Sequence, residues 1–269
     1  NSWVISASRS KSGKVILAND PHIGFAAPST WYEAHLKTPD WELYGHHLAG
    51  IPFALLGHNR RMAWGATMLQ NDDLDYYRER ANPANPDQVW FRDHWEDLKI
   101  IEETISVKGG EDNPLRVRIS RHGPIINDVL ESVEKTEIQP VALAWEMLKN
   151  FENSTEQVFY ELGHSESLAN SRAAVSKLHA PGLNINYGDA EGNIAWWGAA
   201  RLLIRPEHVN SFVILDGASG KDEVLGYRDF SENPQSENPK SGILFNGNNQ
   251  PGDTGSGLEP GYYAPEERA

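Results

Sequence analysis

The chain has 269 residues, of which 39% are hydrophobic and 10% aromatic, enough apolar material for one large core or two modest ones. It carries 38 acidic and 24 basic residues, a formal net charge of −14, so binding to the phosphate backbone of a nucleic acid is not expected. The absence of cysteine excludes disulfides, thiolate metal sites and a cysteine nucleophile, and the longest apolar stretch, residues 48–57, is about half the ~20 residues of a membrane-spanning helix.

The first two thirds of the chain mostly predict β-strands. Strands are expected at residues 3–7, 14–18, 62–67, 74–78 and on both sides of a turn at 109–112. Between the first two strands, Lys11-Ser12-Gly13 is typical of a hairpin turn.

Helical signals come later in the chain. Two adjacent helices are predicted, one capped by Ser154 and one that begins at Ser167. A hairpin is expected over residues 183–197, and the Gly-, Pro-, Asn- and Ser-rich stretch 207–261 predicts loop around a strand at 243–245. Many strands with two neighbouring helices predict an α+β fold, and no glycine-rich phosphate-binding motif occurs.

Four clusters of polar residues lie beside the predicted strands. They are Asn19-Asp20-Pro21-His22, Gly57-His58-Asn59 with Trp64-Gly65-Ala66-Thr67, Asn71-Asp72-Asp73-Leu74-Asp75, and Asn246-Gly247-Asn248-Asn249. Each has a structural explanation: a histidine in a turn, a turn before a buried tryptophan, a solvated acidic turn and an asparagine-rich β-turn. Three also have a functional one, because a fixed histidine can orient a catalytic group, clustered carboxylates can bind Ca²⁺ and an asparagine amide can bind an oxyanion. The His46-His47 pair is interpreted as structural, since no carboxylate or third histidine lies at ligand spacing.

In their order and spacing, these clusters resemble the β-subunit of the penicillin acylase family, which are amidohydrolases with an N-terminal nucleophile. The segment Asn1-Ser2-Trp3-Val4-Ile5 is similar to the family's opening Ser-Asn-x-Trp-Val-Ile, one residue late. The four clusters match, in order, the family elements N-x-P-[HQ], G-H-N with W-G-x-T, D-D-x-D and N-x-N-N. The similarity covers essentially the whole chain.

The resemblance implies an αββα sandwich of antiparallel sheets, of which residues 1–269 form a partial β-subunit core. It places the nucleophilic serine directly before Asn1, exposed by self-cleavage, with its own α-amine as the base. It also implies that His22 assists this amine, and that the backbone N–H of Met68 and the side-chain amide of Asn248 bind the oxyanion. The serine, the α-subunit and roughly the second half of the β-subunit are expected outside this sequence, so the chain by itself is expected to be inactive.

For the acyl pocket and the metal, the resemblance implies two further sets of residues. The acyl chain would contact Ile23, Leu56, Ala66 and Ile185. A structural Ca²⁺ would be held by Asp72, Asp75 and the carbonyl of Leu74, and no organic cofactor is expected.

The activity that the resemblance implies is hydrolysis of a linear acyl amide of the penicillin, cephalosporin or N-acyl-homoserine lactone type, in a periplasmic or secreted protein. Histidine at position 22 is shared with family members that act on glutaryl-cephalosporins and N-acyl-homoserine lactones, whereas penicillin G specialists carry glutamine. The aliphatic Ile23 and Leu56 favour a flexible acyl chain. The alternative is a binding or scaffold domain that keeps the fold without catalysis, and a residue other than Ser, Cys or Thr before Asn1 would favour it.

Overall fold

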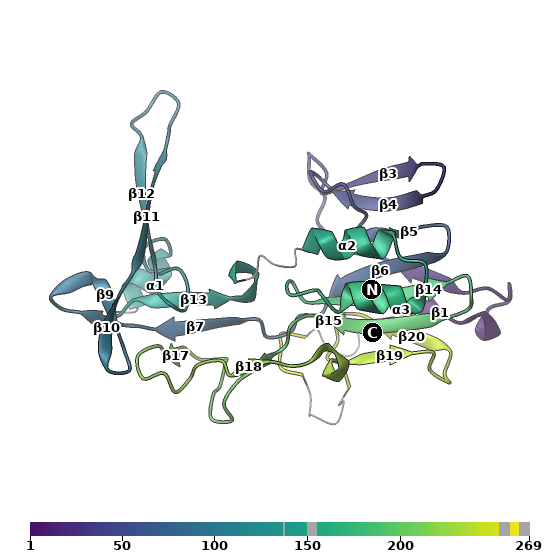
Figure 1. Cartoon of the computed structure of the whole chain (residues 1–269). Helices are drawn as coiled ribbons and strands as arrows, with labels where there is room; N and C mark the ends of the chain where they lie inside the picture. Colours follow the sequence, from purple (N-terminus) through teal and green to yellow (C-terminus); the bar gives the residue numbers. More distant parts are fainter. Residues whose placement is uncertain (137, 150–154, 253–258, 264–269) are drawn as a thin grey trace. The chain divides into compact units, whose positions relative to one another are not determined.

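The computed structural model describes residues 1–136, 138–149, 155–252 and 259–263 (Figure 1). The chain divides into two compact units. The first comprises Asn1–Asp73, Asn150–Leu202 and Arg228–Ala269, and the second comprises Leu74–Lys149 and Leu203–Tyr227. No described helix is both long and apolar enough to cross a membrane.

A seven-stranded antiparallel sheet forms the centre of the first unit. Its strands, in spatial order, are β19 (Gln235–Glu237), β15 (Ile194–Ala199), β14 (Leu183–Asp189), β6 (Met62–Met68), β5 (Leu56–His58), β4 (Glu42–Leu48) and β3 (Trp31–Lys37). The predicted strand at 62–67 and hairpin at 183–197 are confirmed. Strand β14 lies near the middle of the sheet, and every one of its residues is buried.

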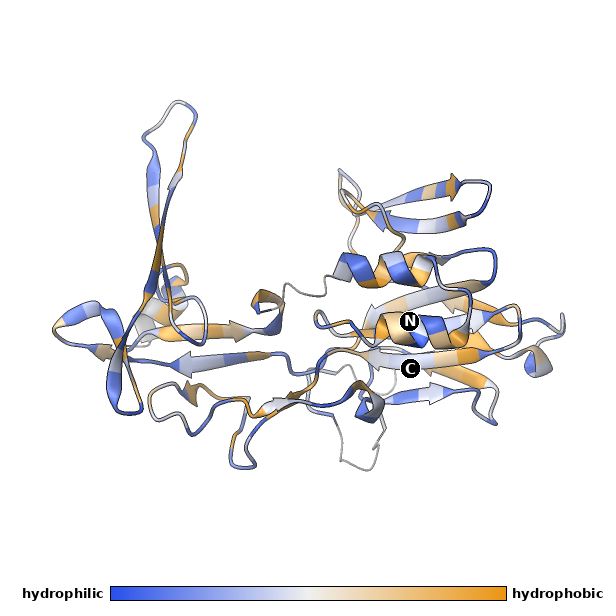
Figure 2. Ribbon diagram, viewed as in Figure 1, coloured by the Kyte–Doolittle hydropathy of each residue, from blue (hydrophilic) through white to orange (hydrophobic). Residues whose placement is uncertain are grey.

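Two helices, α2 (Thr155–Gly163) and α3 (Leu168–Val175), cover one face of this sheet. Their buried residues share one core with Trp64, Ile185 and Trp197 of the sheet. Both helices carry apolar and polar residues, as expected when only one face is buried (Figure 2). The hydroxyl of Ser167 accepts a hydrogen bond from the Asn170 N–H at 3.2 Å and caps α3. The other predicted cap, Ser154, lies outside the described residues.

A three-stranded sheet covers the opposite face of the seven-stranded sheet. Strand β1 (Ser2–Ile5) lies between β2 (Ile16–Asn19) and β20 (Ile243–Asn246), and both pairings are antiparallel. The two sheets approach closely, because a Cβ at Gly65 of β6 would collide with the side chain of Asn19 of β2. The unit therefore has helix, sheet and sheet layers. This accounts for three layers of the predicted αββα sandwich, and the described residues of the unit contain no third α-helix.

The second unit consists mainly of short antiparallel ribbons. Its elements are β7 (Leu74–Arg78), β8 (Arg80–Asn82), β9 (Asn85–Phe91), β10 (His94–Asp97), β11 (Lys99–Ile105), β12 (Asn113–Ile119), α1 (Glu131–Thr136), β13 (Val141–Trp145), β16 (Leu203–Ile204), β17 (Leu215–Asp216) and β18 (Gly226–Tyr227). Strand β7 pairs with β13 on one side and with β17 on the other. The predicted strand at 74–78 and the hairpin around residues 109–112 are confirmed.

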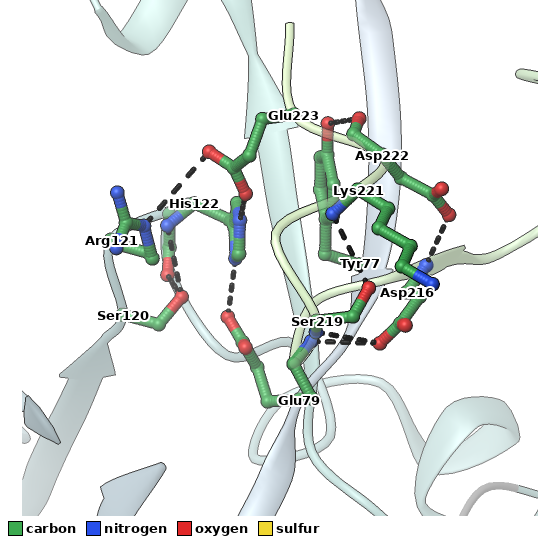
Figure 3. A network of polar contacts seen from close by, with 12 residues as sticks. Tyr77, Glu79, Ser120, Arg121, His122, Asp216, Ser219, Lys221, Asp222 and Glu223 are labelled. Atoms are coloured by element: carbon green, nitrogen blue, oxygen red, sulfur yellow. Dashed lines mark hydrogen bonds and ion pairs between the residues drawn. The ribbon is translucent and has the colours of Figure 1, made fainter. Parts of the chain in front are cut away.

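A buried polar cluster, formed by His122, Glu79 and Glu223, lies inside the second unit (Figure 3). The His122 ring is within hydrogen-bond distance of Glu79 Oε1 through Nδ1 and of Glu223 Oε1 through Nε2, both at 2.7 Å, and stacks on Tyr77 with ring centroids 4.0 Å apart. Burial lowers the pKa of His122, but the hydrogen bonds to Glu223 and Glu79 outweigh this effect, so the pKa is raised above its ordinary value of 6.5. When protonated, the imidazole can donate to both carboxylates, because both of its ring nitrogens then carry a proton.

Candidate active site

A cavity of about 360 Å³ in the first unit brings together most of the predicted site residues. It is lined by Asn1, Pro21, His22, Ile23, Trp31, Leu55, Leu56, Ala66, Thr67, Met68, Gln70, Leu183 and Asn248. Strands β3, β5, β6 and β14, the loop after β2 and the segment after β20 each contribute to its wall, so segments far apart in the sequence meet here.

The two predicted oxyanion donors lie beside each other in this cavity. Asn248 follows β20 in a left-handed conformation, φ 64°, which asparagine tolerates better than most residues. Its side-chain Nδ2 donates a hydrogen bond to the Met68 carbonyl at 2.8 Å. An amide group carries two N–H bonds, so this contact fixes the Asn248 side chain and leaves its second N–H for another acceptor.

The register of β6 sets the direction of the Met68 N–H. Leu69 N–H donates to the Gly182 carbonyl opposite it at 2.9 Å. Hydrogen-bonded pairs alternate along an antiparallel ladder, so the Met68 N–H points away from β14. On that other side, β5 pairs with β6 only at Ala63 and Trp64. The Met68 N–H therefore lies at an open edge of the strand beside the cavity.

Asn1 and His22 lie where β1 begins and β2 ends. The Asn1 carbonyl accepts a hydrogen bond from the Asp20 N–H at 2.8 Å, which extends the β1–β2 ladder by one step. His22 follows Pro21 at the rim of the cavity, with 58% of its side chain exposed and its Nε2 3.7 Å from Asp20 Oδ2. The imidazole is therefore largely open to solvent, at the rim of the cavity that Asn1 also lines.

The apolar wall of the cavity contains three of the four predicted acyl-pocket residues. Leu56 and Ala66 are buried, and Ile23 is half-exposed. The fourth, Ile185, lies directly across from Ala66 in the sheet but is 1% exposed, within the core under the helices, and does not line the cavity. Leu183, two residues earlier on the same face of β14, lines it instead.

A second cavity, of about 600 Å³, adjoins the first, since Pro21, Ile23, Trp31 and Leu56 line both. Sequence reasoning missed Trp31 and Leu183. The signal for Leu183 was its position opposite Met68 in the β6–β14 pairing, which only the strand register reveals.

The residues predicted to hold Ca²⁺ lie where the chain passes from the first segment of the first unit, which ends at Asp73, into the second unit, which begins at Leu74. Asp72 is the penultimate residue of its segment in the first unit, and Leu74 and Asp75 begin the second unit. Both aspartates are buried, which excludes a solvated acidic turn. Within the second unit, Arg205 donates to Asp75 Oδ2 at 3.0 Å and compensates part of this buried charge. The described residues contain no group of three or more His, Cys, Asp or Glu arranged for a metal, and the calcium site stays a prediction.

His47, one of the two histidines interpreted as structural, lies in the core of the first unit. It is 1% exposed in β4, and its ring stacks on Tyr32 with centroids 5.2 Å apart. Burial lowers the pKa of His47, so its imidazole is neutral at pH 7 and acts as part of the packing.

Comparison with known proteins finds similar sequences among acylases, and the similarity extends over nearly the whole chain. The acyl-homoserine lactone acylase QuiP of Pseudomonas aeruginosa is 30% identical over 278 residues, which cover 99% of this chain and 32% of that protein. Penicillin G acylase of Escherichia coli is 27% identical over 253 residues, 93% of this chain and 29% of that protein. The chain thus spans about a third of the length of these curated relatives.

Among solved structures, the thermostable penicillin G acylase of Alcaligenes faecalis superimposes with a TM-score of 0.86 at 26% identity, over 98% of this chain and 46% of that one. The sequence model described as penicillin amidase matches residues 1–269, the full length of the chain. This match shows that the chain belongs to the penicillin amidase family.

Proposed function

We propose that this chain is the β-subunit core of an amidohydrolase that cleaves linear acyl amides through a serine directly before Asn1. The observation that carries the proposal is the meeting of Asn1, Met68 and Asn248 in one cavity, with the Asn248 amide held by the Met68 carbonyl. The three come from the start, the middle and the end of the first unit. Such a convergence of two N–H donors beside a strand end is what an N-terminal nucleophile requires.

In the proposed reaction, the serine hydroxyl attacks the amide carbonyl while its own α-amine takes up the proton. The oxyanion that forms accepts hydrogen bonds from the Met68 N–H and the second N–H of Asn248. The amine leaving group then takes the proton, and water hydrolyses the acyl-serine in the reverse sense. His22, at the rim, supports the α-amine through a hydrogen bond or a water.

We further propose that the acyl group is an aliphatic chain. Ile23, Leu55, Leu56 and Leu183 contribute branched aliphatic side chains to the cavity wall. Trp31 adds one aromatic ring to it. The adjoining cavity of about 600 Å³ offers room beyond the first one for a longer chain. Both penicillin-type amides and N-acyl-homoserine lactones remain within this substrate class.

The remaining features of the proposal are a structural Ca²⁺, an α-subunit from the same precursor, self-cleavage and a periplasmic or secreted location. Two buried carboxylates, Asp72 and Asp75, support the metal, because clustered carboxylate and carbonyl oxygens are the ligands that Ca²⁺ prefers. Bound there, Ca²⁺ would be held by Asp72, Asp75 and the Leu74 carbonyl and would stabilise the fold. It takes no part in the proposed reaction steps.

The test uses the full-length protein and a panel of N-acyl amines with acyl chains of increasing length. We expect hydrolysis that releases a free carboxylic acid, and a serine at the N-terminus of the mature subunit by N-terminal sequencing. A residue other than Ser, Cys or Thr before Asn1, with no hydrolysis of the panel, would favour the non-catalytic scaffold instead.

A further inference from the structure

A continuous chain of side-chain hydrogen bonds runs from the seven-stranded sheet to the three-stranded sheet beside the cavity. In the first half, Trp196 Nε1 donates to Asn184 Oδ1 (3.0 Å), Asn184 Nδ2 donates to Thr67 Oγ1 (3.2 Å), and the Thr67 hydroxyl donates to Asn246 Oδ1. In the second half, Asn246 Nδ2 donates to Asn186 Oδ1 (3.4 Å) and Asn186 Nδ2 donates to Ser2 Oγ (2.7 Å). The Ser2 hydroxyl then donates to the Ala18 carbonyl (3.4 Å). We call this set the amide chain.

The direction of the amide chain is fixed at both ends. The indole N–H of Trp196 can only donate, so Asn184 must turn its oxygen toward it and its NH₂ group toward β6. The Ala18 carbonyl can only accept, so the Ser2 hydroxyl must donate at the other end. Every bond between them then runs the same way, and such chains strengthen one another in a buried, low-dielectric setting.

Four members of the amide chain are almost completely removed from solvent. Asn184 is 1% exposed, Asn186 and Ser2 are 0% exposed, and Asn246 is 5% exposed. In such positions an unpaired amide is costly, because water cannot replace a lost partner. Each of these buried side chains must therefore offer the donor or acceptor that the next side chain in the series needs.

The amide chain touches the proposed oxyanion site at Met68. Besides Thr67, Asn184 Nδ2 donates to the Met68 carbonyl at 3.1 Å, the same oxygen that receives the Asn248 amide at 2.8 Å. Asn184 does not line the cavity. It therefore acts on the site indirectly, through the Met68 carbonyl and through Thr67, which lines the cavity.

At its Ser2 end, the amide chain holds strand β1, which directly follows Asn1. Ser2 directly follows Asn1, and its hydroxyl is tied to Asn186 of β14 from one side and to β2 from the other. Strand β1 is also paired along its length with β2 and β20. The position of Asn1 is thus fixed relative to β14, and β14 is fixed relative to β6.

We propose that the amide chain is a positioning device that keeps the nucleophile-bearing end of β1 in register with the oxyanion donors Met68 and Asn248. Asn184 is its key positioning residue. This inference rests on the proposed function, since it gives the buried asparagines a role in that reaction. A shift of ~1 Å between nucleophile and oxyanion donors is enough to cost ~10²-fold in rate, so a rigid link has a direct kinetic value.

The test is Asn184→Asp in the full-length protein. An aspartate carboxylate still accepts from Trp196 but opposes the Met68 carbonyl with a negative oxygen instead of an N–H. We expect kcat to fall about 10- to 100-fold with KM changed less than about twofold, because substrate binding does not involve this residue. The matched control is Asn233→Asp, since Asn233 is also a buried asparagine, 3% exposed, that donates to two carbonyls, those of Gly198 and Ala200. It lies outside the cavity, so its variant should lose thermal stability but keep kcat.

Trp196→Phe is the second variant, because it removes only the first donor at a half-buried position and keeps the aromatic ring. We expect it to lower kcat about three- to tenfold, so the proposal remains testable if Asn184→Asp does not fold. Normal kcat in folded Asn184→Asp, or in Trp196→Phe when the first variant is not folded, would overturn the inference. An equal loss of kcat in the Asn233→Asp control would do the same, because the effect would then be general destabilisation.

A crystal structure of the variant separates this inference from the proposed function. If the wild-type protein hydrolyses none of the acyl amides, the proposed reaction is wrong. The positioning role still stands if the Asn248 amide leaves the Met68 carbonyl in Asn184→Asp, or in Trp196→Phe where that variant is the folded one. It falls if Asn248 and Ser2 keep their wild-type positions.

Discussion

Replacement of His122 by glutamine should destabilise the second unit, and the loss should depend on pH. Folding raises the pKa of His122 above 6.5, so the protonated imidazole stabilises the fold. This contribution is complete below about pH 6.5 and is lost as the pH rises through the raised pKa. The hydrogen bond from His122 lowers the pKa of Glu223 below its ordinary 4.5, although burial opposes this. The contribution of Glu223 is therefore present above about pH 4.5 and is lost as the pH falls through the lowered pKa.

The size of the effect follows from burial. The side chains of Glu79 and His122 are 1% and 6% exposed, whereas that of Glu223 is 27% exposed. Removal of one partner from a buried ion pair costs about 3–5 kcal/mol, because the other charge is left buried. Glu223 retains some contact with water, and glutamine keeps one N–H donor. We therefore expect the lower end of this range, about 3 kcal/mol at pH 6.

Native-state hydrogen exchange of the β7 and β13 amides in the full-length protein measures the opening free energy of this unit directly. The difference between wild type and His122→Gln should be largest near pH 6 and should shrink toward pH 9. Adding Glu79→Gln to His122→Gln should restore part of the loss, because the buried carboxylate is then removed.

The control is His94→Gln. His94 also lies between two carboxylates, Asp93 at 2.9 Å and Glu96 at 3.3 Å, but its side chain is 57% exposed. Exposed pairs contribute about 0–1 kcal/mol, so this variant should change little. The reasoning is refuted if both histidine variants lose the same free energy, or if the loss in His122→Gln is constant between pH 6 and pH 9.

Other outcomes follow from the cavity and the predicted metal. Asn248→Ala should lower kcat about 10²–10³-fold while the protein still folds and matures, and near-normal turnover would remove Asn248 from the oxyanion site. A calcium chelator should lower the melting temperature of the full-length protein, and an unchanged melting curve would count against the metal at Asp72 and Asp75. Leu56→Phe should shift the preferred acyl chain toward shorter substrates, which the ratio of kcat/KM values across the panel measures; an unchanged ratio would place the acyl chain elsewhere. A protein limited to residues 1–269 should show no amidase activity, and addition of the N-terminal serine alone should not restore the full rate.

Much of the first unit could be predicted because its local signals agree with its tertiary structure. Strands β6 and β15 are apolar runs, and the hairpin at 183–197 has turn residues at its centre, including Gly192 with φ 97°. The motif around Trp64 and Gly65 was visible because a close approach between sheets demands a glycine there. Strand β3, by contrast, is an edge strand that is mostly exposed, so its pattern carries little apolar periodicity.

The buried asparagines could not be predicted from the sequence. Asn184 and Asn186 alternate with apolar residues, which is the pattern of a strand with one face in water. In the fold both faces of β14 are covered, one by the helices and the other by the three-stranded sheet. Two of their partners, Thr67 and Asn246, are distant in the sequence, and even Trp196, on the same hairpin, is placed against Asn184 only by the strand register.

The amide chain has one property that its residue types make unavoidable. Asparagine, threonine, serine and tryptophan carry no group that titrates in the ordinary pH range, so the alignment of β1 with Met68 is independent of proton concentration. In the proposed enzyme, the pH dependence of the rate would then report on the reacting groups and not on the amide chain. Its pH profile could be assigned to chemistry, with no contribution from the scaffold that holds the reacting groups in place.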